Sequence, residues 1–510
     1  MIYLDYAATS YIKEECVYQE MDRLFRTMSV NAGRGTYPAS RQAQKLIDET
    51  RAQIASQTGW YDPSDVYFTA SATQACNIVL QGLSWEQGDI VYLSPYEHNA
   101  IARVMETLRL RYKLQIRLLP VDGDGYIDLE QTRQLFRTYA PKAVCAVMVS
   151  NVTGYILPVR QITQYAHAAG AVVISDMAQA LGIVPVELTK DAPDFIIFAG
   201  HKGIGGPFGT GGFIVCGGKM PEPVLYGGNG VDSRNLQMPL TGSARYEAGS
   251  SNAPAIGALK KALEVLPDPR ETLQREQHQI ALLQKELHGQ RGICFYPAHR
   301  IQEQFTGILS FRLRRYTPEE TADILSAEYD IAVRSGYHCA PYVHDIYGTG
   351  DTGTVRVSVG RYTTEEELIR LTAEILSGEV TEDAVRDKIT VIRAEKDRTL
   401  VFCFKNGKET VKQWREHETV HVCTEEQKRQ ISRKNSGRKR TEEQRRQQSE
   451  RMKEYWKDRE FPEEQRRRQS EQMKAYWNDR EASEGHRQTV SRLMKEMRAK
   501  ETGKGAQNDG

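Results

Sequence analysis

The sequence predicts an α/β fold with a mainly parallel sheet in a large domain, a smaller α/β domain after it, and a C-terminal tail of helical repeats. Residues 171–174 and 193–198 are apolar runs with the length and the β-branched or aromatic content of buried strands. Helical patterns occur elsewhere along the first 375 residues. From residue 424 a short basic unit repeats, which predicts helices of a different kind.

The composition is that of an ordinary globular protein. Of the 510 residues, 40% are hydrophobic and 26% are charged, and the net charge is +1. The chain lacks a run of about 18 apolar residues and a basic N-terminal region followed by an apolar core, so we expect no export and no membrane insertion. Eight cysteines without CxxC pairs favour a reducing cytoplasmic location and no metal site.

The two apolar runs deliver a lysine and an acid to one edge of the predicted sheet. Residues 193–198 lead into a turn with Lys202, and residues 171–174 lead to Asp176. Ligands of parallel α/β sheets bind at the carboxyl ends of the strands. Burial can make such a lysine nucleophilic enough for Schiff-base chemistry. A lysine for the aldehyde and an acid for the pyridinium nitrogen are what pyridoxal phosphate requires.

The motifs around these residues carry a family resemblance. Asp176-x-x-Gln179 followed by Gly200-His201-Lys202 and Gly206-Pro207 closely resembles the class V aminotransferase family, within the fold-type I pyridoxal-phosphate enzymes. The segment Val333-Arg334-Ser335-Gly336-Tyr337-His338-Cys339-Ala340-Pro341 resembles the cysteine desulfurases, in the branch with a short cysteine loop that includes selenocysteine lyase-like proteins. The resemblance runs from residue 1 to about residue 375.

The first third of the chain supplies the expected phosphate cradle. Residues 2–9 resemble the family segment that helps wall the active site, and a helix is expected near residues 39–56. Residues 66–69 predict a strand, and small residues from 70 to 74 lead into a helix through 77–83. Such a turn suits either helix capping or an anion. The resemblance assigns Ala72 and Thr73 to the cofactor phosphate.

The next two predicted strands end in candidate cofactor ligands. Residues 90–93 precede His98, and the resemblance implies that His98 stacks on the pyridine ring and shuttles protons. The apolar strand 143–150 precedes Asn151, which matches the family residue that bonds the cofactor's phenolic oxygen. Gln179 matches the second group near that oxygen.

One position departs from the family pattern. Ser or Thr usually stands two residues before the histidine of the Gly-His-Lys motif, but this chain has Ala199. One phosphate hydrogen bond is therefore expected to be missing, which weakens cofactor retention. His201 remains as a phosphate contact. The glycine-rich residues 203–212 lack the Lys-Ser/Thr of a P-loop and are expected to connect strands.

Residues 245–252 resemble a family segment that reaches across a dimer interface. Ser250 stands where the family has a Thr or Ser that bonds the phosphate of the partner subunit. The resemblance therefore implies a homodimer. Helical patterns over 255–266 and 271–287 lead into the smaller domain.

The smaller domain carries the candidate nucleophile. Cys339 lies in a polar loop beside His338, where its thiol is expected to be reactive rather than inert. Arg356 lies in the strand-like run 354–359 and matches the family arginine that grips the substrate carboxylate together with Asn151. That bidentate task suits arginine better than lysine.

The resemblance stops before the tail. Residues 399–404 and 409–414 flank Lys405-Asn406-Gly407-Lys408, which is a β-hairpin signal within a linker over 376–423. Residues 441–449 return as 462–470, and Met452-Lys453-Glu454-Tyr455-Trp456 returns as Met473-Lys474-Ala475-Tyr476-Trp477. Residues 424–432 are a partial copy, and a worn third copy ends at Met494. We expect short basic helices over 424–500 and disorder over 501–510.

The tail repeats resemble nuclease-associated modular repeats, which are thought to contact DNA. Residues 424–510 carry about seven more basic than acidic residues. Basic helices with interleaved aromatic residues favour nucleic-acid binding through phosphate contacts. Solvated helices or a partly disordered arm explain the same composition.

The resemblance implies a cysteine desulfurase. In it Lys202 would bind pyridoxal phosphate and remove the Cα proton of L-cysteine, Asp176 would keep the ring nitrogen protonated, and Cys339 would take the sulfur as a persulfide. Alanine is then the other product, and an acceptor protein, as in iron–sulfur cluster assembly, takes the sulfur. The alternatives are a selenocysteine lyase, another class V aminotransferase, β-lyase or epimerase, and a nucleic-acid-binding protein whose enzyme part is secondary.

The resemblance also divides the chain. The expected large domain covers about residues 15–255, and the N-terminal segment joins residues 256–375 in the small domain.

Overall fold

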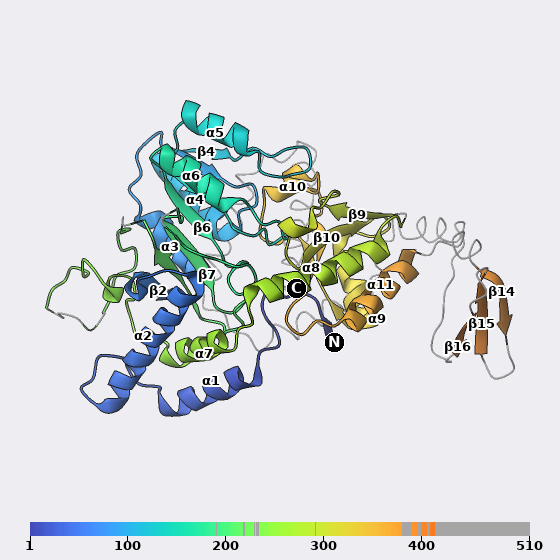
Figure 1. Ribbon diagram of the computed structural model, residues 1–510, viewed down its shortest axis with the longest axis horizontal. Helices are drawn as coiled ribbons and strands as arrows, with labels where there is room; N and C mark the ends of the chain where they lie inside the picture. The colour runs from blue at the N-terminus through green and yellow to red at the C-terminus, as the bar shows by residue number, and fades with distance from the viewer. Residues whose placement is uncertain are drawn as a thin grey trace, which may run out of the picture. The chain divides into compact units, whose positions relative to one another are not determined.

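The computed structural model describes residues 1–189, 191–217, 220–228, 230, 234–290 and 292–379, together with the backbone of residues 389–394, 399–404 and 409–413. Residues 1–391 and 403–408 form one compact unit, and residues 392–402 and 409–510 form a second. Every site residue discussed below belongs to the first unit. Figure 1 labels the helices and strands of the structure.

The first unit is built on a seven-stranded sheet with the order β2-β8-β7-β6-β5-β3-β4. The five strands β4, β3, β5, β6 and β7 run parallel, whereas β8 is antiparallel to both β7 and β2. The strand bounds are β2 Val66–Thr69, β3 Ile90–Leu93, β4 Gln115–Leu118, β5 Ala143–Cys145, β6 Val172–Asp176, β7 Phe195–Ala199 and β8 Gly211–Val215. The sheet is thus mainly parallel, as the sequence predicts.

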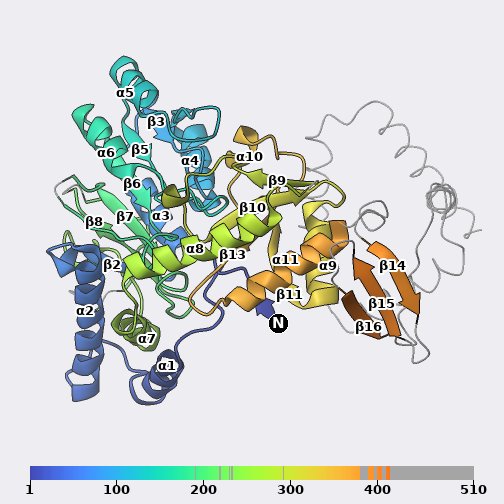
Figure 2. The ribbon, with the colours of Figure 1, turned by 45° about the vertical axis from the view of Figure 1, so that its right-hand side comes forward.

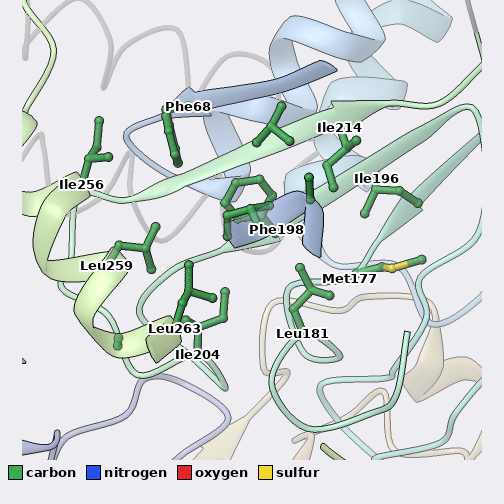
Figure 3. Packing of buried hydrophobic residues seen from close by; sticks show 14 of the residues in the cluster. Phe68, Met177, Leu181, Ile196, Phe198, Ile204, Ile214, Ile256, Leu259 and Leu263 are labelled. Atoms are coloured by element: carbon green, nitrogen blue, oxygen red, sulfur yellow. The ribbon is translucent and has the colours of Figure 1, made fainter. Parts of the chain in front are cut away.

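Alternate residues of the central strands face two different helical layers. Ile196, Phe198 and Ile214 pack with residues of α2 (Pro38–Thr58) and α7 (Ala253–Glu264). Figure 3 shows this packing, with Leu259 and Leu263 of α7 facing the strands. The intervening residues of the same strands pack with α3 (Ala72–Gly82) and α4 (Asn99–Tyr112). Burial on both faces explains the continuous apolar runs of these strands.

A third cluster covers the β3–β6 side of the sheet with α5 (Leu129–Thr138) and α6 (Val159–Ala168). Helix α1 (Glu15–Thr27) packs on α7. The layers hold the carboxyl ends of β5, β6 and β7 at one edge of the sheet, where the site lies.

The smaller part of the unit is a four-stranded sheet with the order β12-β13-β10-β9. Its strands are β9 Ile293–Tyr296, β10 Ile308–Leu313, β12 Arg334–Gly336 and β13 Thr354–Ser358, and every neighbouring pair is antiparallel. Helices α8 (Pro269–Leu287), α9 (Pro318–Tyr329) and α11 (Glu365–Glu379) pack on it, and α10 (Val343–Ile346) follows the cysteine loop (Figure 2). The N-terminal strand β1 (Ile2–Tyr3) pairs in parallel with β11 (Ile331–Ala332), so the chain start joins this part of the fold.

Most predicted elements are confirmed, with small shifts at their ends. The helix expected near 39–56 is α2, and those expected over 255–266 and 271–287 are α7 and α8. The strand expected over 143–150 is wrong in length, because β5 ends at Cys145. Beyond it Ala146 and Met148 still donate N–H bonds to Ile174 and Asp176, so the chain continues beside β6 without forming a regular strand.

Beyond residue 379 the structure describes only a three-stranded sheet with the order β14-β15-β16. Strands β15 (Thr399–Phe404) and β16 (Glu409–Gln413) occupy the two segments that flank Asn406-Gly407, and β14 (Ile389–Ala394) is an additional strand. The turn itself, the basic repeats over 424–500 and residues 501–510 lie outside the described residues.

Candidate active site

A polar cavity of about 190 Å³ lies where the carboxyl ends of the parallel strands meet the smaller sheet. It collects residues from the N-terminal arm (residues 2–13), the start of α3, the ends of β6 and β7, and the cysteine loop. Its walls include most of the sequence-predicted site residues: Ala72, Thr73, His98, Asn151, Asp176, Gln179, Ala199, His201, Lys202, Cys339 and Arg356.

Lys202 reaches the cavity from the turn that follows β7. The turn is closed by Gly200, whose N–H donates to the carbonyl of Thr210 at 2.9 Å. A Cβ at position 200 would collide with the Thr210 hydroxyl, so glycine is needed here. Lys202 is half-buried, and burial lowers the pKa of Lys202, while the nearby Asp176 partly offsets the effect.

Asp176 and Gln179 line the cavity from the end of β6. The buried Asp176 carboxylate accepts a hydrogen bond from the N–H of Ala178 at 2.9 Å, which fixes its orientation. Gln179 donates its amide to the carbonyl of Ala7 at 2.7 Å. The N-terminal arm therefore contacts the acid-bearing turn directly.

The start of helix α3 forms one wall. The Ser71 side chain caps the helix by accepting from the N–H of Gln74 at 3.2 Å, and Ala72 and Thr73 are the first two helical residues. Backbone N–H groups in a first turn lack helical partners and favour an anion. Both Ala72 and Thr73 line the cavity, which suits a phosphate group.

His98 is held as the N-cap of helix α4. Its Nδ1 accepts from the N–H of Ala100 at 3.0 Å, which fixes the ring. Burial, together with the positive charge of Lys202, lowers the pKa of His98 to about 4. The imidazole is therefore neutral near pH 7, with Nε2 as its free nitrogen.

His201 lies beside Lys202 and also lines the cavity. Its ring stacks on Phe208 with centroids 4.8 Å apart, and its Nδ1 lies 3.1 Å from the hydroxyl of Thr9. Burial, followed by the charge of Lys202, lowers the pKa of His201 to about 4. Ala199 lines the cavity but offers no side-chain donor to it.

The cysteine loop is held in an uncommon backbone conformation. His338 and Cys339 have φ values of 50° and 58°, which non-glycine residues adopt rarely. Asn151 donates its side-chain amide to the carbonyl of His338 at 2.6 Å, and the N–H of Asn99 donates to the carbonyl of Cys339 at 2.6 Å. These two bonds anchor the loop to the large domain.

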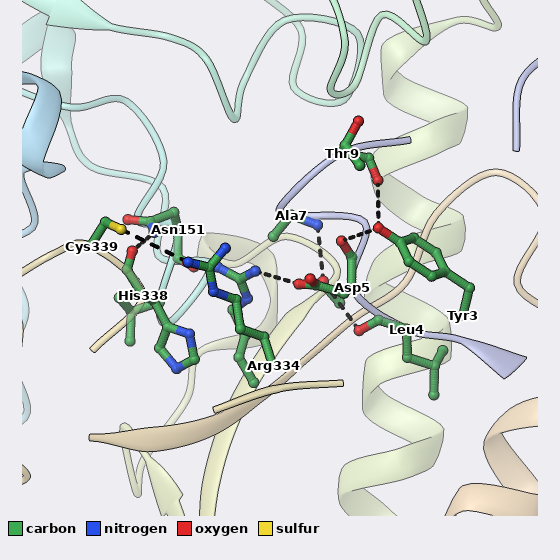
Figure 4. Close-up of polar contacts among 12 residues, drawn as sticks. Tyr3, Leu4, Asp5, Ala7, Thr9, Asn151, Arg334, His338 and Cys339 are labelled. Carbon is green, nitrogen blue, oxygen red and sulfur yellow. Dashed lines mark hydrogen bonds and ion pairs between the residues drawn. The ribbon is translucent and has the colours of Figure 1, made fainter. Parts of the chain in front are cut away.

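The Cys339 sulfur faces the cavity next to Arg334. The Nη2 of Arg334 lies 3.8 Å from Sγ, and Figure 4 shows this contact beside Asn151 and His338. Cys339 is exposed, so its sulfur is open to reagents from outside. A cationic neighbour and an open approach are the features of a reactive thiol.

Arg356 is almost fully buried, with 1% of its surface exposed. Its guanidinium donates to the carboxylate of Asp5 at 2.5 Å and to the carbonyl of Asn151 at 2.9 Å. Its Nε has no hydrogen-bond partner in the structure. An unpaired buried donor in the cavity wall suits a ligand carboxylate.

The N-terminal arm ties the two parts of the fold to the lysine turn. Ser10 belongs to none of the sequence motifs. Its N–H nevertheless donates to the carbonyl of His201 at 3.0 Å, and its hydroxyl donates to the carbonyl of Lys202 at 2.6 Å. The Tyr3 hydroxyl donates to the carbonyls of Asp5 and Thr9, as Figure 4 shows.

Sequence reasoning missed several residues of this site. The cysteine motif contains Arg334 and His338 but assigns no contact to either. Asp5 lies in the segment 2–9 that the resemblance places at the site, again without a role of its own, and Ser10 lies outside every motif. Ser250 is exposed and is not among the residues that line the cavity of this single chain. Its predicted contact with a partner subunit stays a prediction.

The cavity fits pyridoxal phosphate by its donor set. It contains an amine without a hydrogen-bond partner, an acid on the same wall and an open helix N-terminus, as an aldehyde, a pyridinium nitrogen and a phosphate require. The described residues contain no cluster of three or more His, Cys, Asp or Glu that could hold a metal ion. In the same part of the chain, none of the helices has the length and apolar character needed to cross a bilayer.

Comparisons with known proteins point the same way as the site. The Aminotransferase class-V family profile matches residues 2–371. A probable cysteine desulfurase of Methanothermobacter thermautotrophicus is 31% identical over 385 residues, which cover 74% of this chain and 94% of that protein. A cysteine desulfurase of Pectobacterium atrosepticum is 31% identical over 389 residues, which cover 73% and 92%.

Solved structures are similar over the same region. The apo structure of a cysteine desulfurase from Thermococcus onnurineus aligns with a TM-score of 0.67 and 28% identity, covering 74% of this chain and 95% of that one. A cysteine desulfurase of Escherichia coli aligns with a TM-score of 0.66 and 24% identity, and this likeness shows the fold alone.

Proposed function

The chain belongs to the class V aminotransferase family, and on this premise we propose that it is a pyridoxal-phosphate-dependent cysteine desulfurase. The observation that carries the proposal is the meeting of three groups in one cavity. Lys202, Asp176 and the exposed Cys339 line the same cavity. A transaminase would need the first two groups but not the third.

The residues proposed to hold the cofactor surround Lys202. Lys202 would bind its aldehyde, Asp176 its ring nitrogen, Asn151 and Gln179 its phenolic oxygen, and His98 its ring face. Its phosphate would meet the first turn of α3 at Ala72 and Thr73, together with His201. When bound, pyridoxal phosphate stabilises the electron pair that a Cα proton leaves behind.

Recognition of the substrate carboxylate is assigned to Arg356. Arg356 is anchored by Asp5 and keeps a free Nε, so it would bind the carboxylate of L-cysteine. Arg356 lies in the same wall as Asn151, which also holds the carbonyl of His338. Carboxylate binding and the position of the cysteine loop are therefore linked through Asn151, whose main-chain carbonyl accepts from Arg356 and whose side-chain amide donates to His338.

Proton and sulfur transfer are assigned to Lys202 and Cys339. The lowered pKa of Lys202 leaves a larger fraction of the amine neutral and able to take the Cα proton. Attack of the Cys339 thiolate on the substrate sulfur forms an S–S bond and breaks the Cβ–S bond. The electron pair of that bond stays with the carbon skeleton, which leaves as alanine after protonation at Cβ and return of a proton to Cα.

The same residues would serve a selenocysteine lyase, and another class V reaction would use Lys202 without Cys339. The test is incubation of the purified protein with L-cysteine and a reductant, with alanine and sulfide measured together. We expect equal amounts of both. Cys339→Ser should lose both products while keeping the absorption band of the bound cofactor, and Lys202→Ala should lose that band.

Two outcomes would contradict the proposal. Alanine formation that persists in Cys339→Ser would assign the reaction to another member of the class. A wild-type protein that binds no pyridoxal phosphate after reconstitution would remove the cofactor from the site.

We also propose a homodimer, a sulfur-acceptor protein and a cytosolic location. Large apolar side chains lie exposed in the part of the chain that precedes Ser250, namely Phe208, Leu225, Tyr226, Leu236 and Leu240. Such exposure is typical of an interface, and Ser250 would then reach the phosphate of the partner subunit. The described cysteines are free thiols, which supports a reducing compartment. Light scattering should give twice the chain mass of 57.8 kDa.

A further inference from the structure

A second cavity lies on the other side of the N-terminal arm from the active site. Ala7 and Gln179 line both cavities, so the arm is the wall between them. The second cavity has room of about 50 Å³. Helix α8, which Figure 2 shows beside the smaller sheet, supplies Thr272, Arg275 and Glu276 to it.

The charges around this cavity do not balance. Its ionisable side chains are Tyr6, Lys13, Glu14, Arg275, Glu276, Arg361 and Tyr362. Arg361 pairs with Glu14 at 3.0 Å, whereas the described residues offer neither Lys13 nor Arg275 a carboxylate within 4.0 Å. Burial raises the pKa of Glu276 to about 8, so this carboxyl is mostly neutral at pH 7. The cavity therefore has an excess of positive charge on Arg275 and Lys13, although burial also lowers the pKa of Lys13.

Hydrogen-bonding groups in the cavity wall are also left unpaired. The Nε and Nη2 of Arg275 and the hydroxyl of Thr272 are buried and have no partner in the structure. Thr272 is 7% exposed. Leaving such groups unsatisfied costs about 1–3 kcal/mol each, and more for a charged group. Nε and Nη2 form one edge of the guanidinium, which matches the two oxygens of a carboxylate.

We infer that this cavity is a binding site for a small monocarboxylate anion, held by the Nε–Nη2 edge of Arg275 and the hydroxyl of Thr272. The available room suits an anion of about four or five heavy atoms, such as acetate or fluoroacetate. Water would fill the same space as roughly three or four molecules, but it would leave the two cations unneutralised. An amino acid fits less well, because its ammonium group would add to the excess of positive charge.

The site is coupled to the lysine turn by the arm. The Lys13 ammonium donates to the carbonyl of Ser10, and the Ser10 hydroxyl donates to the carbonyl of Lys202. An anion beside Lys13 would thus contact the segment that positions the reactive lysine. The inference does not depend on which reaction the active site performs.

The test uses fluoroacetate as a probe with the holoenzyme and follows the width of its ¹⁹F signal. We expect at least a two-fold broadening with the wild type, which Arg275→Gln removes. Arg270→Gln changes an exposed residue of the same helix and should broaden the signal as the wild type does. The Thr272→Val protein keeps the side-chain volume and the charge at this position and should bind fluoroacetate several-fold more weakly than the wild type. This second variant tests the site even if Arg275→Gln fails to fold.

Unlabelled acetate should displace the probe fraction that depends on Arg275, and L-alanine should not. Broadening that is equal in Arg275→Gln and Arg270→Gln would place the anion elsewhere, such as at Arg356, and would overturn the inference. Displacement of the Arg275-dependent fraction by L-alanine would overturn the choice of ligand class.

Discussion

At the residue scale, burial sets the charge of the groups around Lys202. It lowers the pKa values of Lys202, His98 and His201, and it raises the pKa of Glu97 to about 8. Glu97 lies directly before His98, and its Oε1 accepts from the hydroxyl of Ser94 and the N–H of Val147. His98, His201 and Glu97 are therefore mostly neutral near pH 7, and each changes charge only at a cost in stability.

Replacing Glu97 by Gln should make the protein less sensitive to alkaline pH. The pKa of Glu97 rises from 4.5 to about 8 on folding, so the native carboxyl keeps its proton where the unfolded one loses it. The stability from this group is complete below pH 4.5 and is lost as the pH rises toward 8. Urea unfolding at pH 5 and pH 8 should show a smaller loss in Glu97→Gln, by at most about 4 kcal/mol over these three pH units at 1.4 kcal/mol per unit.

Glu86→Gln, which alters an exposed carboxyl nearby, should follow the wild type. Parallel pH profiles for wild type and Glu97→Gln would show that Glu97 is ionised in the native state.

Restoring a hydroxyl at position 199 should strengthen cofactor binding. Ala199 is buried in the cavity wall near His201, where the family usually has Ser or Thr. One added hydrogen bond is worth about 0.5–1.5 kcal/mol, which corresponds to roughly a 2- to 12-fold lower dissociation constant in Ala199→Ser. Equilibrium dialysis with pyridoxal phosphate measures it. An unchanged constant would place the phosphate away from residue 199.

At the scale of elements, the N-terminal arm acts as a strap across the site. It pairs with β11 at Ile2, bonds Arg356 through Asp5, and bonds the carbonyls of His201 and Lys202 through Ser10. Helices α3 and α4 supply their first turns to the same cavity. Each functional side chain is therefore fixed by an element that begins or ends at the cavity, so small shifts of those elements will alter the chemistry.

Asp5→Asn should destabilise the fold and weaken substrate binding together. The change leaves the Arg356 guanidinium, of which 1% is exposed, without its counter-charge. Losing one partner of a largely buried pair costs about 3 kcal/mol. The melting temperature should fall and the KM for L-cysteine should rise. Asp22→Asn, which breaks an exposed ion pair on α1, is the matched control and should change neither. Equal melting temperatures of Asp5→Asn and the wild type would show that the Asp5–Arg356 pair does not hold the N-terminal arm in place.

At the scale of the whole molecule, the chain joins a catalytic unit to a basic tail that lies outside the family match. The family match ends at residue 371, and residues 424–510 carry the repeated basic segments. The two parts are expected to act independently, because the site described here takes all its residues from the first 360.

Deleting residues 424–510 should therefore leave alanine formation unchanged. If the tail binds nucleic acid through phosphate contacts, the full chain should shift labelled DNA or RNA in a salt-dependent manner, and the truncated chain should not. Gel shifts at two salt concentrations measure this. Equal shifts with both chains, or none with the full chain, would contradict nucleic-acid binding by the tail.

The sequence alone determined the fold class, most strand and helix positions, and most of the residues that line the cavity, among them Lys202 and Cys339. It could do so because buried strands, glycine turns and the lysine and cysteine motifs are local patterns. Only the tertiary structure decided the partners of these residues. The Asp5–Arg356 pair joins residues 351 positions apart in the chain, and the Arg334 contact with Cys339 depends on a left-handed loop. The unpaired Nε and Nη2 of Arg275 are buried where the arm and α8 line one cavity. Contacts between residues far apart in the chain leave no local pattern, because each depends on the packing of several elements at once.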